Sequence, residues 1–391
     1  MLTKEMEMFL CENEAAALSL LRELAQIPAP SGKEEKRAQF CRDWLNAQGA
    51  EGVYIDDAGN VLYPVGSQES IEVFAAHTDV VFPDETPLPL SERDGRLYCP
   101  GIGDDTACLV CLLLACKFIA RCEKEDRRSD WQRLRGTDAP GLLLACNTGE
   151  EGLGNLRGIR EICRVYGERM QSFCTFDATL SHIVNRAVGS RRFRVSVDTK
   201  GGHSFRNFGT DNAIEKLSGI VEHLYRIRTP QDGRTTNNVG CFSGGTTVNS
   251  IAQHAEMLYE IRSEEPGYLA RTEQQFLKIL EEARRASAPG THIRSELLGG
   301  RPCGMPAGLR QQEKLTARAL AAVKSVTGKQ PALGSGSTDC NLPLSLGIPS
   351  ICVGCYEGSG AHTREEYVEI SSLKKGYRTA FEMIFGSRRS V

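Results

Sequence analysis

The chain has 391 residues, of which 40% are hydrophobic and 25% charged, a composition of globular proteins that excludes disordered, collagen-like and coiled-coil classes. At roughly 100 to 200 residues per domain, this length predicts two or three domains. Lysine and arginine number 47, aspartate and glutamate number 50, and the formal charge is −3, so nucleic acid is not indicated as a partner. Only seven histidines are available for an imidazole metal site or proton shuttle.

The fifteen cysteines are an odd number spread along the chain, and many lie inside apolar runs. This usage predicts buried free thiols in a reducing compartment rather than a disulfide scaffold. The N-terminal segment is acidic and lacks the basic region and apolar core of a signal peptide. The longest apolar run, residues 107–116, has ten residues, against roughly 20 for a bilayer span. We therefore expect a cytoplasmic protein without a membrane span.

The first part of the chain alternates helical and strand patterns. Helical spacing covers residues 15–25 and 33–48, and four short apolar runs follow at residues 71–76, 142–146, 173–176 and 350–353. Such runs are typical of strands buried on both faces of a sheet. Strands alternating with helices predict an α/β domain with a mostly parallel sheet, whose sites lie at the carboxyl ends of the strands.

Residues 191–298 have a different pattern. Apolar residues alternate with polar ones over 193–197 and 255–261, helical spacing covers 214–224 and 276–283, and shorter strand signals lie at 239–242 and 293–297. The order β-α-β-β-α-β predicts a ferredoxin-like sandwich. Since a helix over 315–326 and the strand at 350–353 follow, we expect residues 189–298 to be inserted into a domain formed by 1–188 and 299–391. The charged segment 121–140 is interpreted as a solvated helix end and loop.

Residues of the metal-ligand type follow the predicted strands of the α/β domain. They are His77, Asp79, Glu150, Glu151 and Asp177, joined by Asp104 and Asp105 on a glycine loop and by His362 far downstream. Imidazole and carboxylate together suit zinc, manganese or cobalt, and two such ions can share a bridging carboxylate and a bridging water. The order of these residues and their placement at one sheet edge predict a two-metal site.

The adjacent pair Glu150 and Glu151 suggests a division of roles. Two neighbouring side chains of an extended backbone point in different directions, so one can bind metal while the other acts as a base. Metal coordination lowers the pKa of water toward neutrality, and the second carboxylate takes its proton and passes it to the leaving amine. Each motif alone has a simpler interpretation: a hydrogen-bonded loop histidine at His77, a solvated turn at the glutamates and a helix N-cap at Asp104.

Taken together, the motifs resemble the M20 metallopeptidase family, which includes peptidase T-like tripeptidases, dipeptidases and amino acid deacylases. The resemblance covers nearly the whole chain. It rests on His77-Thr-Asp79, Gly103-Asp104-Asp105, Gly149-Glu150-Glu151-Gly, Asp177, Gly201-Gly-His203-Ser, Gly244-Gly-Thr-Thr-Val-Asn249, Arg262, and the stretch from Ser335-Gly-Ser-Thr-Asp339 to His362. The fold that the resemblance implies is a zinc-exopeptidase-like catalytic domain with an inserted lid and dimerisation domain.

The resemblance also implies a role for each matching residue. One metal is held by His77, Asp104 and Asp177, and the other by Asp104, Glu151 and His362, so that Asp104 bridges. Glu150 matches the general base that activates the metal-bridging water, and Asp79 matches the carboxylate that orients His77. Two divalent ions are implied, with zinc favoured over manganese or cobalt.

In the inserted domain, the resemblance implies substrate-binding roles for His203, Asn249 and Arg262 and a homodimer. His203 matches a residue that reaches the partner subunit's site and stabilises an oxyanion, and Arg262 suits a substrate carboxylate. The simpler interpretations are a turn histidine and a surface charge. The chain departs from many relatives at Thr106, where they have Lys, and at Glu260, where they have Asp.

The expected activity is cleavage of an amide bond in a small peptide by a tripeptidase-like aminopeptidase. Relatives that cleave from a free amino terminus tend to have Asp at the position of Asp177, whereas deacylases and carboxypeptidases tend to have Glu. The alternative is an N-acyl amino acid deacylase or carboxypeptidase of the same family. More distant alternatives are an inert binding module and a redox enzyme using the Cys-x-x-Cys pairs at 108–111 and 352–355, which are better interpreted as core thiols.

Overall fold

The computed structural model describes residues 2–125, 139–230, 233–304 and 310–386, together with Gln132, Arg135 and Gly136. The chain divides into two compact units. The main unit comprises Met1–Arg186 and Met305–Val391, and the inserted unit comprises Ala187–Gly304. No helix among the described residues is both long enough and apolar enough to cross a membrane.

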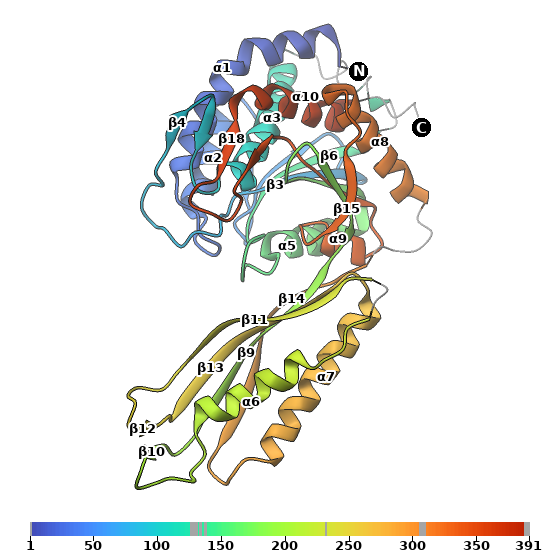
Figure 1. Ribbon diagram of the computed structural model, residues 1–391. Coiled ribbons are helices and arrows are strands. Elements are labelled where there is room, and N and C mark those ends of the chain that lie inside the picture. Colours follow the sequence, from blue (N-terminus) through green and yellow to red (C-terminus); the bar gives the residue numbers. More distant parts are fainter. Residues whose placement is uncertain are drawn as a thin grey trace. The chain divides into compact units, whose positions relative to one another are not determined.

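An eight-stranded sheet forms the centre of the main unit, in the order β1-β2-β6-β3-β7-β16-β8-β15 (Figure 1). The strands are β1 (Tyr54–Ile55), β2 (Val61–Val65), β3 (Ile71–His77), β6 (Gly141–Asn147), β7 (Met170–Phe176), β8 (His182–Ala187), β15 (Ala332–Gly336) and β16 (Ser350–Val353). The central strands β6, β3, β7 and β16 are parallel, while β2 and β8 pair antiparallel at their flanks. The predicted α/β fold with a mostly parallel sheet is confirmed.

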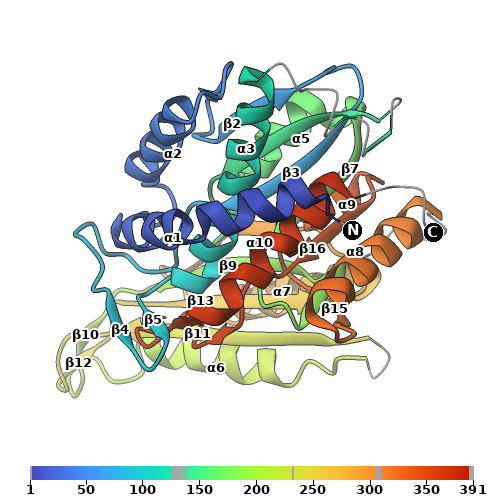
Figure 2. The ribbon, with the colours of Figure 1, turned by 90° about the horizontal axis from the view of Figure 1, so that it is seen from above.

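Helices cover both faces of this sheet. They are α1 (Lys4–Gln26), α2 (Glu35–Ala47), α3 (Cys108–Lys124), α5 (Arg157–Tyr166), α8 (Arg310–Thr327), α9 (Asn341–Ser345) and α10 (Ile370–Phe385). Helices α1, α3 and α10 pack against one another (Figure 2), and α5 packs with α9 on the opposite face (Figure 1). Because α3 is apolar nearly all round, it is buried almost completely, as expected for such a helix.

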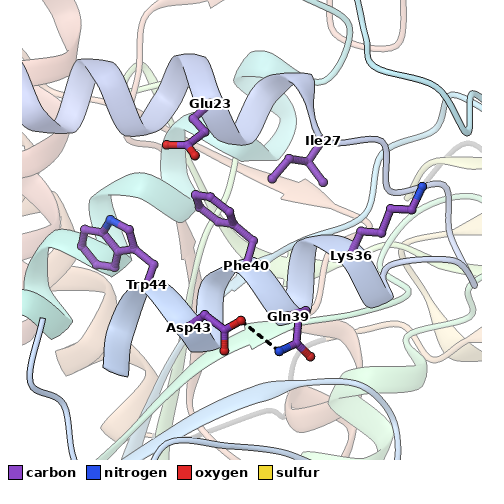
Figure 3. A pocket seen from close by; sticks show the side chains of 7 residues that line it. All are labelled: Glu23, Ile27, Lys36, Gln39, Phe40, Asp43 and Trp44. Atoms are coloured by element: carbon purple, nitrogen blue, oxygen red, sulfur yellow. Dashed lines mark hydrogen bonds between the residues drawn. The ribbon is translucent and has the colours of Figure 1, made fainter. Parts of the chain in front are cut away.

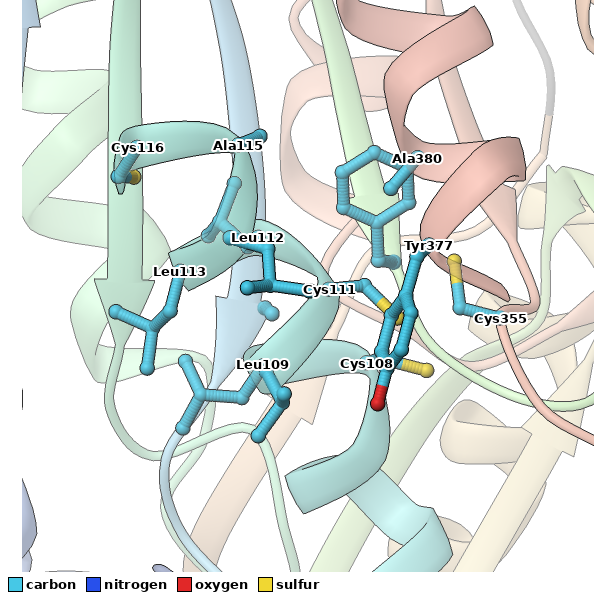
Figure 4. Packing of buried hydrophobic residues seen from close by; sticks show 14 of the residues in the cluster. Cys108, Leu109, Cys111, Leu112, Leu113, Ala115, Cys116, Cys355, Tyr377 and Ala380 are labelled. Atoms are coloured by element: carbon cyan, nitrogen blue, oxygen red, sulfur yellow. The ribbon is translucent and has the colours of Figure 1, made fainter. Parts of the chain in front are cut away.

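The cysteines lie mainly in this core. Twelve of the fifteen are buried, the exceptions being Cys11, Cys241 and Cys303, and none forms a disulfide. Figure 4 shows Cys108 and Cys111 of α3 beside Cys355, in the packed cluster with Tyr377. Burial raises the pKa of the Cys111 and Cys355 thiols. These are core thiols, as predicted, and burial opposes the thiolate that a redox enzyme would need.

The main unit also contains a short helical segment before α3 and a second, smaller sheet. The π-helical segment η1 (Ile102–Ala107) leads into α3. Strands β4 (Ser91–Arg93), β5 (Arg96–Tyr98), β17 (Gly358–Ser359) and β18 (Tyr367–Glu369) form an antiparallel sheet in the order β17-β18-β5-β4. His362 lies on the loop between β17 and β18. These strands have two or three residues, too few for the sequence pattern to reveal them.

The inserted unit is a four-stranded antiparallel sheet in the order β11-β13-β9-β14, with two helices packed on it. Its elements are β9 (Gly189–Asp198), β10 (Gly202–His203), α6 (Ala213–Tyr225), β11 (Thr235–Gly244), β12 (Ser250–Ile251), β13 (His254–Ser263), α7 (Pro266–Arg285) and β14 (His292–Arg301). In its core, the ring of Phe276 stacks on Tyr259 and packs at a tilt against Phe193. This order is consistent with the predicted sandwich, to which the short pair β10-β12 is added.

The interpretation of segment 121–140 as solvated is wrong for Arg135. Within this segment, residues 126–131, 133, 134, 137 and 138 lie outside the described residues. Arg135 is buried, and its guanidinium lies 2.5 Å from the Glu72 carboxylate on β3. Glu72 also accepts a hydrogen bond from Ser172. A buried charge requires such partners, and sequence periodicity does not show them.

Candidate metal centre

His77 is the last residue of β3, where its imidazole is almost completely buried. Its Nε2 atom lies 3.1 Å from Oδ1 of Asp104. Its Nδ1 atom lies 3.0 Å from the backbone oxygen of Asp79 and 3.5 Å from Oδ1 of the same residue. One ring nitrogen is therefore oriented by Asp79, and the other points to a carboxylate, as in a metal-binding histidine with an outer partner.

Asp104 lies between two imidazoles. Its Oδ1 is 3.1 Å from Nε2 of His77, and its Oδ2 is 3.1 Å from Nε2 of His362. Burial opposes ionisation of this carboxyl group, but the hydrogen bonds to His362 and His77 outweigh it and lower the pKa of Asp104 below its usual range. An ionised aspartate held between two imidazoles has the geometry of a bridging ligand.

The adjacent glutamates follow β6 and are both buried. Oε1 of Glu151 lies 3.1 Å from Nε2 of His362. The backbone N–H groups of Glu150 and Glu151 donate to the two carboxylate oxygens of Asp79 at 3.1 and 2.8 Å. The Ser31 hydroxyl donates to Asp79 at 2.6 Å. Asp79 thus orients His77 and also fixes the backbone that carries both glutamates.

Asp177 follows β7, and its N–H donates to the Val353 oxygen of neighbouring β16 at 3.2 Å. Burial, followed by the nearby Asp104 carboxylate, raises the pKa of Asp177 to about 7. Carboxylates crowded in a buried site repel each other, and a divalent cation would favour their ionised forms. The donor set therefore fits a metal ion.

The ligand atoms form three groups within 4.8 Å. These are His77, Asp104 and Asp177; Asp104, Glu151 and His362; and His77, Glu150 and Glu151. The first two groups share Asp104 and correspond to the two predicted ligand sets. The main unit thus brings together the seven residues to which the family resemblance gives a role in the centre.

The inserted unit does not bring its three candidates together. His203 pairs with Ser250, and the Ser204 N–H donates to the Asn249 oxygen at 3.0 Å, so His203 and Asn249 are neighbours. Arg262 pairs with Ser190 at the far end of β13, where its Nε donates to Glu260 at 2.8 Å. The eight residue steps from His254 to Arg262 span about 26 Å at 3.3 Å per step.

Three residues around the centre were not foreseen: Ser31, Arg37 and Glu366. Arg37 is completely buried, and its guanidinium donates to the Thr78 carbonyl at 3.0 Å and to the Thr106 hydroxyl at 3.3 Å. Burial lowers the pKa of Arg37 to about 10. It ties the segments after His77 and after Asp105 to α2. Its partners are mostly backbone groups, which no motif of side chains reveals.

A separate cavity of about 500 Å³ lies between α1 and α2 (Figure 3). It is lined by Glu23, Ile27, Lys36, Gln39, Phe40, Asp43 and Trp44. Figure 3 shows Phe40 and Trp44 on one helix, with the Glu23 carboxylate facing them from the other. None of the candidate site residues lines this cavity, so it is distinct from the metal centre.

We expect metal binding to strengthen as the pH rises. Hydrogen bonds to Asp104 and Glu151 raise the pKa of His362 to about 10, and the pKa of Asp177 is about 7. A metal needs both groups deprotonated, so binding releases protons. The proton of His362 should make the apparent affinity rise by about tenfold per pH unit up to pH 10, and that of Asp177 should add a similar rise only below pH 7. Chelator competition at pH 6, 7 and 8 measures this slope, and equal affinity at all three values would contradict it.

A mostly parallel α/β sheet that ends in two ligand sets sharing one aspartate is the arrangement of a metallohydrolase. The sequence matches the peptidase family M20/M25/M40 over residues 73–385, and the chain belongs to this family. It is therefore a hydrolase of the metallopeptidase and amidohydrolase class, as the sequence motifs predicted.

Relatives cover nearly the whole chain. Succinyl-diaminopimelate desuccinylase of Methylorubrum populi is 24% identical over 394 residues, with 93% of this chain and 96% of that protein covered. A tripeptidase of Staphylococcus aureus has a TM-score of 0.72 at 21% identity, covering 95% and 98% of the two chains. A dinuclear metal-binding M20 peptidase of Bacillus subtilis has a TM-score of 0.61 at 15% identity, covering 95% and 97%. At these identities the solved structures show a common fold.

Proposed function

We propose that the protein is a dinuclear metal-dependent hydrolase that cleaves an amide bond of a small peptide, as an aminopeptidase of the tripeptidase type. The observation that carries the proposal is the position of Asp104, 3.1 Å from the imidazoles of both His77 and His362. Shared ligands of this kind are a feature of two-metal sites. The donor set suits zinc first, with manganese or cobalt as alternatives.

In this proposal the protein holds two ions through the two groups that share Asp104. His77 and Asp177 complete one set, and Glu151 and His362 complete the other. When bound, the ions would supply Lewis acidity and lower the pKa of a water molecule. Asp79 keeps His77 in the orientation that directs Nε2 to the centre.

Glu150 is proposed as the general base. Its carboxylate reaches within 4.8 Å of the ligand atoms of His77 and Glu151, and its N–H is anchored on Asp79. A glutamate held beside the ligand groups can take a proton from water and deliver it to the nitrogen of the leaving amine. The anchored backbone limits the positions that its carboxylate can take.

The inserted unit is proposed to act as a lid and to form a homodimer. His203 and Asn249 lie beside the short pair β10-β12, which leads into the start of β13, whereas Arg262 lies at the far end of β13, which is about 26 Å long from His254 to Arg262. They cannot bind the same small substrate within one copy of the unit, which favours use of residues from two copies. Phe205 and Phe208 follow His203 in the chain and are 87% and 92% exposed, and exposed aromatic residues close in the chain favour an interface.

Two observations point to different substrates. Aspartate at position 177 favours cleavage from a free amino terminus, by resemblance to the tripeptidase-like members. The similarity to a desuccinylase favours the second candidate, an N-acyl amino acid deacylase. Both activities break an amide bond and need the same centre, so the metal ligands alone do not separate them.

A substrate screen separates the two candidates. The metal-loaded protein is assayed with free tripeptides and dipeptides, the same peptides with a blocked amino terminus, and N-succinyl and N-acetyl amino acids. We expect kcat/KM for free tripeptides to exceed that for the blocked ones by at least about tenfold, or 1.4 kcal/mol. Faster cleavage of N-acyl amino acids than of free peptides would contradict the aminopeptidase assignment and support the deacylase.

A further inference from the structure

We propose that Glu366 is a positioning residue that fixes the backbone of the Asp104 loop and thereby sets the affinity of both metal ions together. The inference rests on the proposed bridging role of Asp104. Glu366 lies four residues after His362, immediately before β18, and is 1% exposed. No metal-ligand motif includes it.

The carboxylate of Glu366 accepts three backbone hydrogen bonds from one short segment. Its Oε1 accepts from the N–H groups of Gly103 and Asp104 at 2.9 and 2.8 Å, and its Oε2 accepts from that of Gly101 at 2.7 Å. These lengths are in the normal range of N–H···O hydrogen bonds. Burial raises the pKa of Glu366 to about 7, and the three N–H donors oppose this by stabilising the ionised carboxylate. The loop that carries Asp104 is thus held at three points.

The two glycines of this loop allow its backbone to lie close to Glu366 and to the surrounding side chains. Gly101 has a φ of 75°, in the left-handed region, and a Cβ there would lie 2.4 Å from Val80. A Cβ on Gly103 would lie 2.6 Å from the ring of Tyr356. The segment therefore packs tightly against its surroundings while it directs its N–H groups at Glu366, which is a reason for glycine at both positions.

The connection between β17 and β18 holds Asp104 at both its backbone and its side chain. Glu366 binds its N–H, and His362, on the same connection between β17 and β18, lies 3.1 Å from its Oδ2. Movement of the Asp104 backbone would therefore displace its carboxylate relative to both ligand sets. Loss of Glu366 should weaken both sites in parallel, whereas loss of His362 should act mainly on the one set that contains it.

Glutamine does not replace this carboxylate. Its amide oxygen can accept from Gly103 and Asp104, but its NH₂ group would then face the N–H of Gly101, so two donors would meet. Aspartate keeps the charge and both acceptors but is one methylene shorter. Glu366→Asp should therefore retain more metal affinity than Glu366→Gln.

The test measures the two dissociation constants for Zn²⁺ by chelator competition, on protein shown to be folded by circular dichroism. Glu366→Gln is compared with wild type, with His362→Ala, and with Glu365→Gln, a matched change at the exposed neighbouring residue. We expect Glu366→Gln to raise both constants by about 10- to 100-fold, the usual effect of losing an outer partner of a ligand. Glu365→Gln should leave both unchanged.

The same measurement distinguishes failure of the Glu366 role from failure of the proposed metal centre. If Glu366→Gln binds both ions within about twofold of wild type, or loses affinity at one site alone, the positioning role is wrong. If wild type itself binds no Zn²⁺, the proposed metal centre fails and the role of Glu366 with it. Should Glu366→Gln not fold, Glu366→Asp is measured in the same way, and a parallel rise of both constants is again required.

Discussion

Glu150→Gln is expected to keep both metal ions and to lose amide hydrolysis, with kcat lower by about 10²- to 10⁴-fold, the usual contribution of a general base. The substitution keeps the size of the side chain but removes its ability to take a proton. The ligand groups that share Asp104 do not include Glu150, so the metal content should stay at the wild-type value. The measurement pairs steady-state kinetics with metal analysis of the same sample.

The matched control is Glu69→Gln, which makes the same change on an exposed loop before β3. It should leave both kcat and metal content unchanged. Wild-type kcat in Glu150→Gln would contradict the proposed base. A variant that loses its metal together with its activity would show instead that Glu150 is a ligand, since its carboxylate also lies within 4.8 Å of His77 and Glu151 ligand atoms.

Asp104→Asn should abolish activity and weaken both metal sites at once. The carboxylate offers one oxygen to each imidazole at 3.1 Å, whereas asparagine offers only one oxygen and turns an NH₂ group toward the other side. Loss of the negative charge also reduces the attraction for two cations. We expect affinity for both ions to fall by more than about 100-fold, the upper end for outer partners of a ligand.

Two further variants test whether the loss of both metal sites is specific to Asp104. Asp57→Asn, an exposed aspartate on the turn after β1, should bind metal and catalyse as the wild type does. Asp177→Asn should weaken mainly the set that contains Asp177. If Asp104→Asn instead retains one ion at wild-type affinity, Asp104 belongs to a single site, and the two ions do not share it.

Much of the centre follows from strand order alone. Strands β3, β6 and β7 are parallel neighbours, so the segments after them meet at one edge of the sheet. The sequence placed His77, the two glutamates and Asp177 directly after those strands, and the structure brings them together. Asp104 and His362 needed the family resemblance as well, because they lie on loops whose course the apolar pattern does not determine.

What the sequence did not predict has a common physical cause. Glu366 accepts from backbone N–H groups, Arg37 donates largely to carbonyl groups, and Asp79 accepts from the glutamate backbone as well as orienting His77. Backbone partners are the same for every residue type and leave no signature in a sequence.

The start of α1 was missed for a different reason. Its first turns are acidic and partly exposed, and only the Thr3 side chain, which caps them, marks the beginning.

The central claim is that one aspartate joins two metal sites. Anomalous diffraction from crystals grown with Zn²⁺ tests it most directly. We expect two peaks about 3.5 to 4 Å apart, one beside His77 and Asp177, the other beside Glu151 and His362, with Asp104 in contact with both. A single peak, or two peaks that do not share Asp104, would contradict it.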